Sequence, residues 1–523
     1  MTIEASMGEA AAIEESLEQF LIVLCVSLGV ATISQISSFF RQIPYTLLLV
    51  IVGLGLAFVD IRLVNLSPEL ILEIFLPPLL FEAAWNIQWR NLKNNLIPVS
   101  LLAIVGVVIT VLGIGFTVSY FTDLTLPIAL LVGASLAATD PVAVIALFRE
   151  LGVGERLTVL TEGESLFNDG VAVVAFGILV AIPMGTQEFS TTNTLIQFVT
   201  FTGVGIAVGS LIGFGISYLT QRFDLPLVEQ SLTLVSAYGT YLLTEELGGS
   251  GVIGVVTAGL ILGNFGSRIG MSPRTRLSVS EFWEFIAFFV NSIVFLLIGD
   301  QIDIRGLVDK WQLIAVSIIA LVGVRAISIF GLGTISNFIT GKNPITWQQQ
   351  TVLWWGGLRG SVSIALALSV PMMLDGRQDI IEAVFGVVLF TLLVQGLSMQ
   401  TVIQKLGLIG DRAQRETYSE LLARRNALEQ VLERLNEVKL SPSIDEEFKN
   451  THRGIVQEKL DEVNQEITQL QESYPQLRSL DQEQIQEELL DLEAETYAEL
   501  VRSGKLNKNL SPILEEIFAK EKE

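Results

Sequence analysis

The chain has little of the side-chain chemistry that most enzymes use. Its 523 residues include one cysteine, Cys25, and one histidine, His452. A single cysteine excludes an intramolecular disulfide and a cysteine-based zinc site. Without a histidine in residues 1–410, no Ser–His, Cys–His or HExxH arrangement can form there. The chain also lacks the G-x-x-x-x-G-K-[ST] motif of ATP-binding loops. We therefore expect a protein that is not an enzyme and that needs no cofactor.

Charged residues are scarce and unevenly distributed. They make up 17% of the chain, against about 25% in an average soluble domain. Residues 411–523 contain 26 acidic and 15 basic residues, whereas the longer segment 1–410 contains 29 and 17. The sequence thus predicts a membrane domain over 1–410 and a polar tail over 411–523. The net charge of −23 argues against nucleic acid as a partner.

A basic N-terminus is also absent. The first 18 residues contain five glutamates and no lysine or arginine, whereas a secretory signal peptide begins with basic residues. We expect the apolar run that follows to remain as the first membrane helix.

What the sequence does contain is a series of long apolar segments. A membrane-spanning helix needs about 20 mostly apolar residues. Thirteen segments meet this criterion: 17–38, 44–62, 68–88, 96–121, 126–149, 157–183, 195–219, 226–246, 249–265, 282–299, 311–335, 348–371 and 380–402. We therefore predict an all-α polytopic membrane protein, with a soluble helical tail after the last span.

The basic residues between these spans predict the orientation in the membrane. Loops after odd-numbered spans contain eleven lysines and arginines, and loops after even-numbered spans contain four. Since basic residues favour the cytoplasmic side, we expect the N-terminus outside and the tail in the cytoplasm. The expected location is the cell membrane.

The fifth and twelfth spans are both interrupted. The fifth contains Thr-Asp-Pro at 139–141, and the twelfth contains Gly-Gly-Leu-Arg-Gly-Ser at 356–361. The twelfth follows the fifth by seven spans, an odd offset, so the two must cross the membrane in opposite directions. A pair of broken helices in inverted halves is a sequence sign of a transporter's binding site.

The first break provides oxygen ligands. Pro141 disfavours helical backbone at Asp140, which should release carbonyl groups near Thr139. Free carbonyls at membrane depth are tolerated only beside protein or a wet cavity, and they bind small hard cations, as carboxylates do. Thr139 and Asp140 are thus candidate cation ligands.

The sixth span places more polar groups nearby. Ser165 and Asp169 are four residues apart and share a helix face, and Asn168 is one position away from it. We expect Asp169, with Ser165 and Asn168, to face Asp140 across a cavity. The alternative is that the two aspartates form a buried structural pair with an arginine.

The sequence leaves two alternatives open for each of two further acids. Glu164 should point away from Asp169 and needs a cationic partner, either Arg325 or Arg359. We favour Arg359, because its glycine-rich surroundings allow close approach of the backbone. Glu82 lies near the expected cytoplasmic end of the third span, as a surface acid or at the edge of the ion site.

Four motifs together resemble the NhaP-type sodium/proton antiporters, the bacterial relatives of the animal sodium/proton exchangers. They are FLPPLLFEAAW at 75–85, ATDPVAV at 138–144, EGESLFNDG at 162–170 and GGLRGSVSIALAL at 356–368. The resemblance covers about 400 residues, which is the whole membrane domain but not the tail.

The resemblance implies more than the residues show by themselves. It implies inverted repeats, unwound fifth and twelfth helices, a homodimer and elevator-like alternating access. The ion ligands would be Asp169, Asp140, Ser165 and the backbone of Thr139, with Glu82 at the edge. Asn168 would occupy the first position of the family's Asn–Asp pair, which implies electroneutral exchange. Glu164 and Arg359 would form the structural ion pair.

The expected mechanism is competition between Na⁺ (or Li⁺) and H⁺ for Asp169 and Asp140. The site would cross the membrane only when neutralised, because a bare charge is costly in hydrocarbon. A K⁺/H⁺ antiporter could use the same oxygens. A cation channel or a membrane sensor with the tail as output are further alternatives, and neither would show saturable proton-coupled flux.

The tail shows helical periodicity over 413–438 and 444–472, with further helical stretches near 481–503. We predict a helical hairpin or short coiled coil packed on itself. Regulation by pH or a dimer contact is the alternative. His452 is interpreted as a solvated surface residue rather than a pH sensor.

Overall fold

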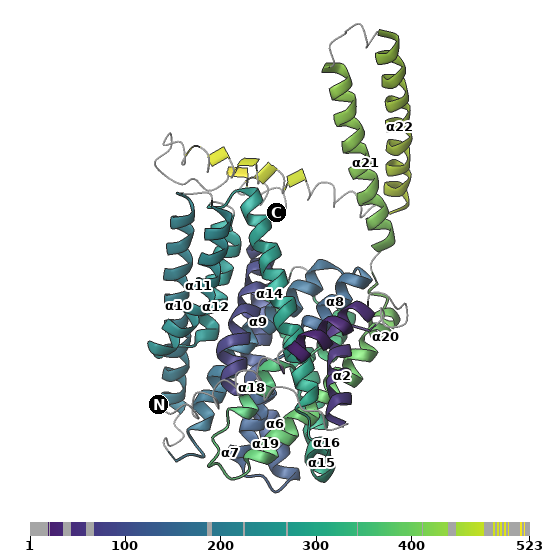
Figure 1. Ribbon diagram of the computed structural model, residues 1–523. Helices are drawn as coiled ribbons and strands as arrows, with labels where there is room; N and C mark the ends of the chain where they lie inside the picture. Colours follow the sequence, from purple (N-terminus) through teal and green to yellow (C-terminus); the bar gives the residue numbers. More distant parts are fainter. Residues whose placement is uncertain are drawn as a thin grey trace, which may run out of the picture. The chain divides into compact units, whose positions relative to one another are not determined.

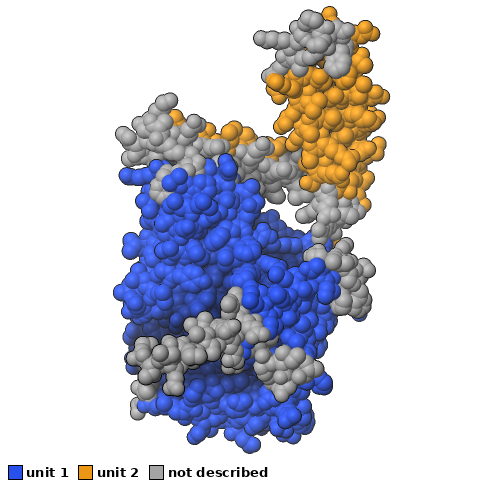
Figure 2. All heavy atoms as spheres, in the orientation of Figure 1, with its two compact units in different colours: residues 1–408, 501–505 blue, residues 409–500, 506–523 orange. Residues whose placement is uncertain are grey.

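The described part of the chain consists of helices joined by turns and loops. The computed structural model describes residues 21–34, 43–58, 67–185, 191–222, 225–267, 270–341, 344–409, 412–437 and 446–474, together with residue 19 and scattered residues between 485 and 517. Within those ranges there is no strand. Two compact units are present, 1–408 with 501–505 and 409–500 with 506–523 (Figures 1 and 2). The predicted all-α fold is confirmed.

The first half of the larger unit contains the first six predicted spans. A helix over Leu21–Ser34 precedes those named in Figure 1. The others are α2 (Tyr45–Phe58), η2 (Leu70–Phe75) continuing into α3 (Leu76–Asn86), the short α4 (Trp89–Asn94), α5 (Leu96–Ser100) continuing through η3 (Leu101–Val105) into α6 (Gly106–Phe121), α7 (Leu126–Ser135), α8 (Val142–Leu151) and α9 (Glu155–Val180).

The second half contains the remaining seven spans. They are α10 (Thr191–Thr220), α11 (Pro226–Glu246), α12 (Gly251–Ile261) continuing into η4 (Leu262–Gly266), α14 (Pro273–Asp300), the short α15 (Ile304–Asp309), α16 (Trp311–Thr340), α17 (Trp347–Trp355), α18 (Ser361–Leu368), and α19 (Arg377–Phe390) continuing through η5 (Thr391–Gly396) into α20 (Leu397–Lys405). Each of the thirteen predicted spans therefore contains helix among its described residues, and the fifth and twelfth are interrupted.

Local signals set several helix ends. Thr346 and Gln349 form a reciprocal capping box at the start of α17, and Ser272 caps α14. Gly152 and Gly341 end α8 and α16 with φ of 64° and 58°, values that only glycine adopts easily. These caps satisfy backbone groups that have no partner within the helix at its ends.

Many large apolar side chains lie on the surface of this unit. On α10 alone, Leu195, Val199 and Leu211 are 61–73% exposed. Contiguous exposed apolar helix faces of this length are typical of a protein that contacts lipid. One continuous buried cluster fills the interior, and it surrounds the two interrupted helices.

The smaller unit contains a pair of packed helices. Helices α21 (Arg412–Glu437) and α22 (Glu446–Ser473) pack through Tyr418, Leu421, Leu422 and Ile467. Nε2 of Gln471 donates to the Tyr418 hydroxyl at 2.6 Å. The predicted helical hairpin is confirmed, and His452 is exposed on α22. Most of 481–503 lies outside the described residues.

Candidate functional site

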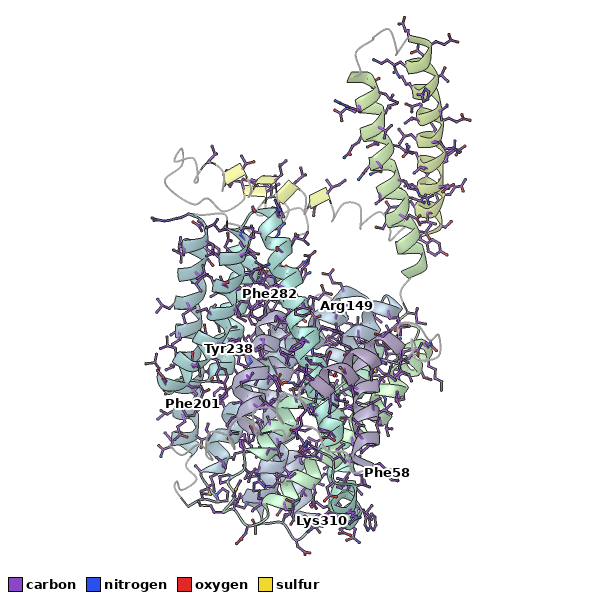
Figure 3. The ribbon with its side chains drawn as sticks, in the orientation of Figure 1. Phe58, Arg149, Phe201, Tyr238, Phe282 and Lys310 are labelled. Atoms are coloured by element: carbon purple, nitrogen blue, oxygen red, sulfur yellow. The ribbon has the colours of Figure 1, made fainter. Side chains whose placement is uncertain are left out.

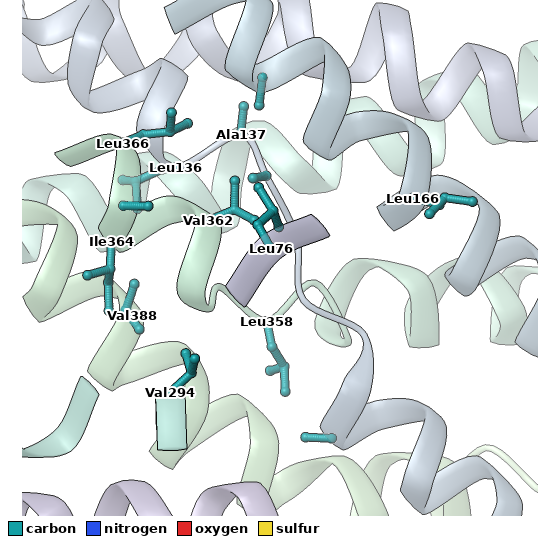
Figure 4. Packing of buried hydrophobic residues seen from close by; sticks show 14 of the residues in the cluster. Leu76, Leu136, Ala137, Leu166, Val294, Leu358, Val362, Ile364, Leu366 and Val388 are labelled. Carbon is teal, nitrogen blue, oxygen red and sulfur yellow. The ribbon is translucent and has the colours of Figure 1, made fainter. Parts of the chain in front are cut away.

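The two interrupted helices meet at their breaks. The fifth span is split between α7 and α8, and the twelfth between α17 and α18. The backbone N–H of Asp140, in the first break, donates to the carbonyl of Leu358, in the second, at 2.8 Å. Figure 4 shows side chains from both breaks, Leu136 and Leu358, among the buried hydrophobic residues of the interior. The predicted interruptions are therefore confirmed, and they contact each other.

Glycine at position 360 makes this close contact possible. A Cβ atom there would lie 2.0 Å from Oδ2 of Asp140 and 2.6 Å from its Cβ. Both distances are too short for real atoms, so any side chain at 360 must displace Asp140. Gly360 therefore determines where the Asp140 carboxylate lies.

We expect Gly360→Ala to reduce transport by about 100-fold, because a ligand displaced by about 1 Å loses its geometry. The measurement is initial transport rate per amount of purified protein in vesicles. Gly177→Ala on α9 is the matched control, since its added Cβ would meet nothing within 4 Å. Normal transport by Gly360→Ala would show that the Asp140 position is not critical.

An arginine stabilises the end of each broken helix. Nη1 of Arg359 donates to the carbonyls of Ala137 and Ala138 at 3.4 and 3.0 Å, just after α7 ends. Arg325 donates from Nη2 to Leu353 at 2.9 Å and from Nε to Trp354 at 3.2 Å, where α17 ends. Both side chains are buried. Positive charge at these carbonyls offsets the negative end of each helix dipole.

The predicted pairing of Glu164 with Arg359 is wrong. Oε1 of Glu164 accepts from Nη1 of Arg325 at 2.9 Å, and both side chains are at least nine-tenths buried. The guanidinium of Arg359 instead faces the carbonyls after α7. It still lies within electrostatic range of Glu164 and Asp169. The glycines around Arg359 serve another contact, because a Cβ at Gly357 would overlap Arg325 at 2.0 Å from Nε.

The polar residues of α9 hold the first break in place. The hydroxyl of Ser165 donates to the carbonyl of Thr139. Nδ2 of Asn168 donates to Oγ1 of Thr139 at 2.7 Å, and its Oδ1 accepts from the Thr139 N–H at 3.2 Å. Asp140 Oδ1 accepts from the N–H of Val142 at 3.1 Å, at the start of α8. Asn168 therefore positions Thr139 with both ends of its amide.

Asp169 differs from Ser165 and Asn168 because one of its side-chain oxygens has no hydrogen-bond partner in the described structure. Its Oδ1 is buried and has no hydrogen-bond partner among the described residues. Asp140 lies within electrostatic range. A buried carboxylate oxygen with no donor is costly, unless a proton or a cation occupies it.

A cavity of about 100 Å³ connects these groups. It has room for a few waters or one partly hydrated ion. Predicted ligands that line it are Thr139, Asp140, Ser165, Asp169 and Glu82. Asn168 is one helix position away from the cavity and contacts it through Thr139. Two carboxylates, a hydroxyl and a backbone carbonyl form a set of hard oxygen donors that suits a small cation.

Four polar residues of the cavity wall were not among the site residues predicted from the sequence: Glu162, Asn291, Ser361 and Ser363. One signal was available for Glu162. It precedes Asp169 by seven residues, which places both on the same face of a helix. Asn291 had no such signal, because it comes from α14, a helix distant in sequence.

Two discontinuous helices that cross beside an acidic cavity define a secondary transporter. Comparison with known proteins identifies the group more narrowly. The family described as "Sodium/hydrogen exchanger, transmembrane" matches residues 23–405, and the chain belongs to this family.

Individual relatives agree with this assignment. The chain is 79% identical to the Na⁺/H⁺ antiporter ApNhaP of Aphanothece halophytica, over 99% of this chain and all of that protein. It is 58% identical to the low-affinity Na⁺/H⁺ antiporter NhaS1 of Synechocystis, over 98% of each. Among solved structures, the sodium proton antiporter MjNhaP1 of Methanocaldococcus jannaschii aligns with a TM-score of 0.60 at 22% identity, covering 75% of this chain and 99% of that chain. At that identity, the likeness establishes the fold.

Proposed function

We propose that this chain exchanges Na⁺ for H⁺ across the cell membrane by alternating access. The observation that carries the proposal is the unpartnered, buried oxygen of Asp169, a residue that lines the cavity where the two broken helices meet. The names of the two relatives cited above support Na⁺ rather than K⁺ as the cargo. Li⁺ would use the same oxygens.

The geometry supports a competition mechanism. Either a proton on Asp169 or a Na⁺ ion held by Asp169, Asp140, Ser165 and the Thr139 carbonyl neutralises the site. Only a neutralised site crosses the membrane, because a bare carboxylate in hydrocarbon costs several kcal/mol. Glu82 lies at the cavity wall, where it would attract the arriving cation.

We propose one Na⁺ for one H⁺, without net charge movement. The position before Asp169 is an asparagine whose amide is engaged with Thr139. It therefore contributes no second titrating group beside Asp169. We further propose that the N-terminus is outside, that 411–523 form a cytoplasmic tail, and that the chain works as a homodimer.

The test uses purified protein in proteoliposomes loaded with a pH-sensitive dye. An imposed proton gradient is challenged with Na⁺, Li⁺ or K⁺, with and without valinomycin clamping the membrane potential. We expect Na⁺ and Li⁺ to dissipate the gradient at a rate that the clamp does not change.

Each other outcome changes a defined part of the proposal. Dissipation by K⁺ alone would keep the site and replace the cargo. A rate that depends on the clamp would contradict one-for-one exchange. The absence of any flux over a wide range of pH would contradict transport itself.

A further inference from the structure

Acidic and polar residues of α9 lie in a row along the cavity wall. Glu162, Ser165 and Asp169 follow one another at intervals of three and four on α9, so they form one stripe along the helix. The stripe is about 10.5 Å long, at 1.5 Å per residue. All three residues line the cavity. A cation that enters at Glu162 can therefore move past Ser165 to Asp169.

Three observations place the entrance at Glu162. Its side chain is 23% exposed, whereas Ser165 and Asp169 are buried. It lies on the second turn of α9, and Glu82 lies near the end of α3. Both helix ends adjoin loops that the basic-residue count assigns to the cytoplasm.

Several acids gather at this entrance. Glu162 and Glu284 act electrostatically on Glu82, and Glu155 acts on Glu162. Carboxylates at the mouth of a narrow cavity raise the local concentration of cations. Such a group, left uncompensated, would attract any cation.

One base lies among these acids. Nη2 of Arg149 is 3.9 Å from Oε1 of Glu162, and the arginine also acts on Glu82. Arg149 belongs to the last turn of α8, the helix that follows the Asp140 break (Figure 3). Its side chain is 70% exposed, so the ion pair is loose and costs little to open.

We propose that Arg149 is the counter-ion of the entrance and sets the apparent affinity for Na⁺ on that side of the membrane. Its guanidinium competes with the arriving cation for Glu162 and Glu82. The proposal rests on the function proposed above. Because Arg149 does not line the cavity, its role is to position charge rather than to bind the transported ion.

Removing this charge should improve the capture of Na⁺. We expect Arg149→Gln to lower the apparent KM for Na⁺ by about three- to tenfold at low ionic strength, with little change in maximal rate. Glu162→Gln should raise KM by a similar factor. Arg149→Lys keeps the charge and should resemble the unchanged protein. The effect of Arg149→Gln should shrink in added choline chloride, because salt screens exposed charges.

The measurement is Na⁺-dependent dissipation of a proton gradient in everted membrane vesicles, whose outer surface is the cytoplasmic face. Arg222→Gln is the matched control. Arg222 is exposed, follows α10 in a loop assigned to the same side, and is not part of the cavity wall. Its substitution should leave KM unchanged.

The outcomes separate this inference from the proposed function. If the unchanged protein shows no response to Na⁺, the proposed function fails. If it responds, and Arg149→Gln has the same KM as Arg222→Gln, only the role of Arg149 is refuted. A KM that changes equally in Arg149→Lys would also refute it, since the effect would then come from shape and not from charge.

Discussion

Replacing Asp169 with asparagine is expected to reduce Na⁺/H⁺ exchange to background. Asparagine has the same shape, but it takes up no proton and offers no negative charge to a cation. Asp140 remains, yet its Oδ1 is already engaged with the start of α8. The variant should therefore lose both halves of the exchange at every pH and at every Na⁺ concentration.

Binding and folding can be measured separately for this variant. The unchanged protein in detergent should melt at a higher temperature in the presence of Na⁺, because a bound ligand stabilises the folded state. Asp169→Asn should melt at least as high without Na⁺ and show no Na⁺-dependent rise, since it no longer buries a carboxylate without a hydrogen-bond donor. Asp123→Asn makes the same chemical change at an exposed residue distant from the cavity wall and should behave as the unchanged protein. Sodium flux that still depends on pH in Asp169→Asn would refute the competition mechanism.

Replacing one partner of the Glu164–Arg325 pair is expected to lower the free energy of unfolding more than any other single substitution at the site. Removing one partner of a buried ion pair costs about 3–5 kcal/mol, because the other charge stays buried without compensation. Arg325→Met should be the worse of the two changes, since it also deprives the carbonyls of Leu353 and Trp354 of their donor. Glu164→Gln leaves those two hydrogen bonds intact.

The apparent melting temperature in detergent is the measurement for this second prediction. We expect the order unchanged protein, Glu164→Gln, Arg325→Met, from most to least stable. The double variant Glu164→Leu/Arg325→Met should recover part of the loss, because no unpaired charge remains. An equal effect of the two single changes would mean that the helix-end carbonyls contribute nothing.

The location of the candidate site could be proposed from the sequence because its signals are local. Pro141 breaks its own helix through its ring and its missing N–H, whatever packs around it. Ser165 and Asp169 share a face of α9 by the geometry of the helix alone. The role of Asn168 was less accessible: its position next to the site is local, but its two hydrogen bonds to Thr139 depend on where α9 packs.

The partner of Glu164 could not be identified from local sequence signals. Two buried arginines were available, and the sequence contains nothing that says which of two distant helices faces α9. The structure places Arg325 of α16 against Glu164 and directs Arg359 toward the carbonyls after α7. The glycines near Arg359 were interpreted as room for its own side chain, whereas Gly357 makes room for Arg325 and Gly360 for Asp140.

By itself, the sequence determined the apolar helices, the two breaks and the acidic residues beside them. These features follow from hydrophobicity, charge and backbone chemistry, which act over one or two helical turns. Only the tertiary structure decided that the breaks touch, which arginine stabilises which helix end, and that Arg149 lies beside Glu162 of the cavity wall. Those contacts join residues up to 222 positions apart. They depend on how whole helices pack, because no local property of the chain specifies a partner at that distance.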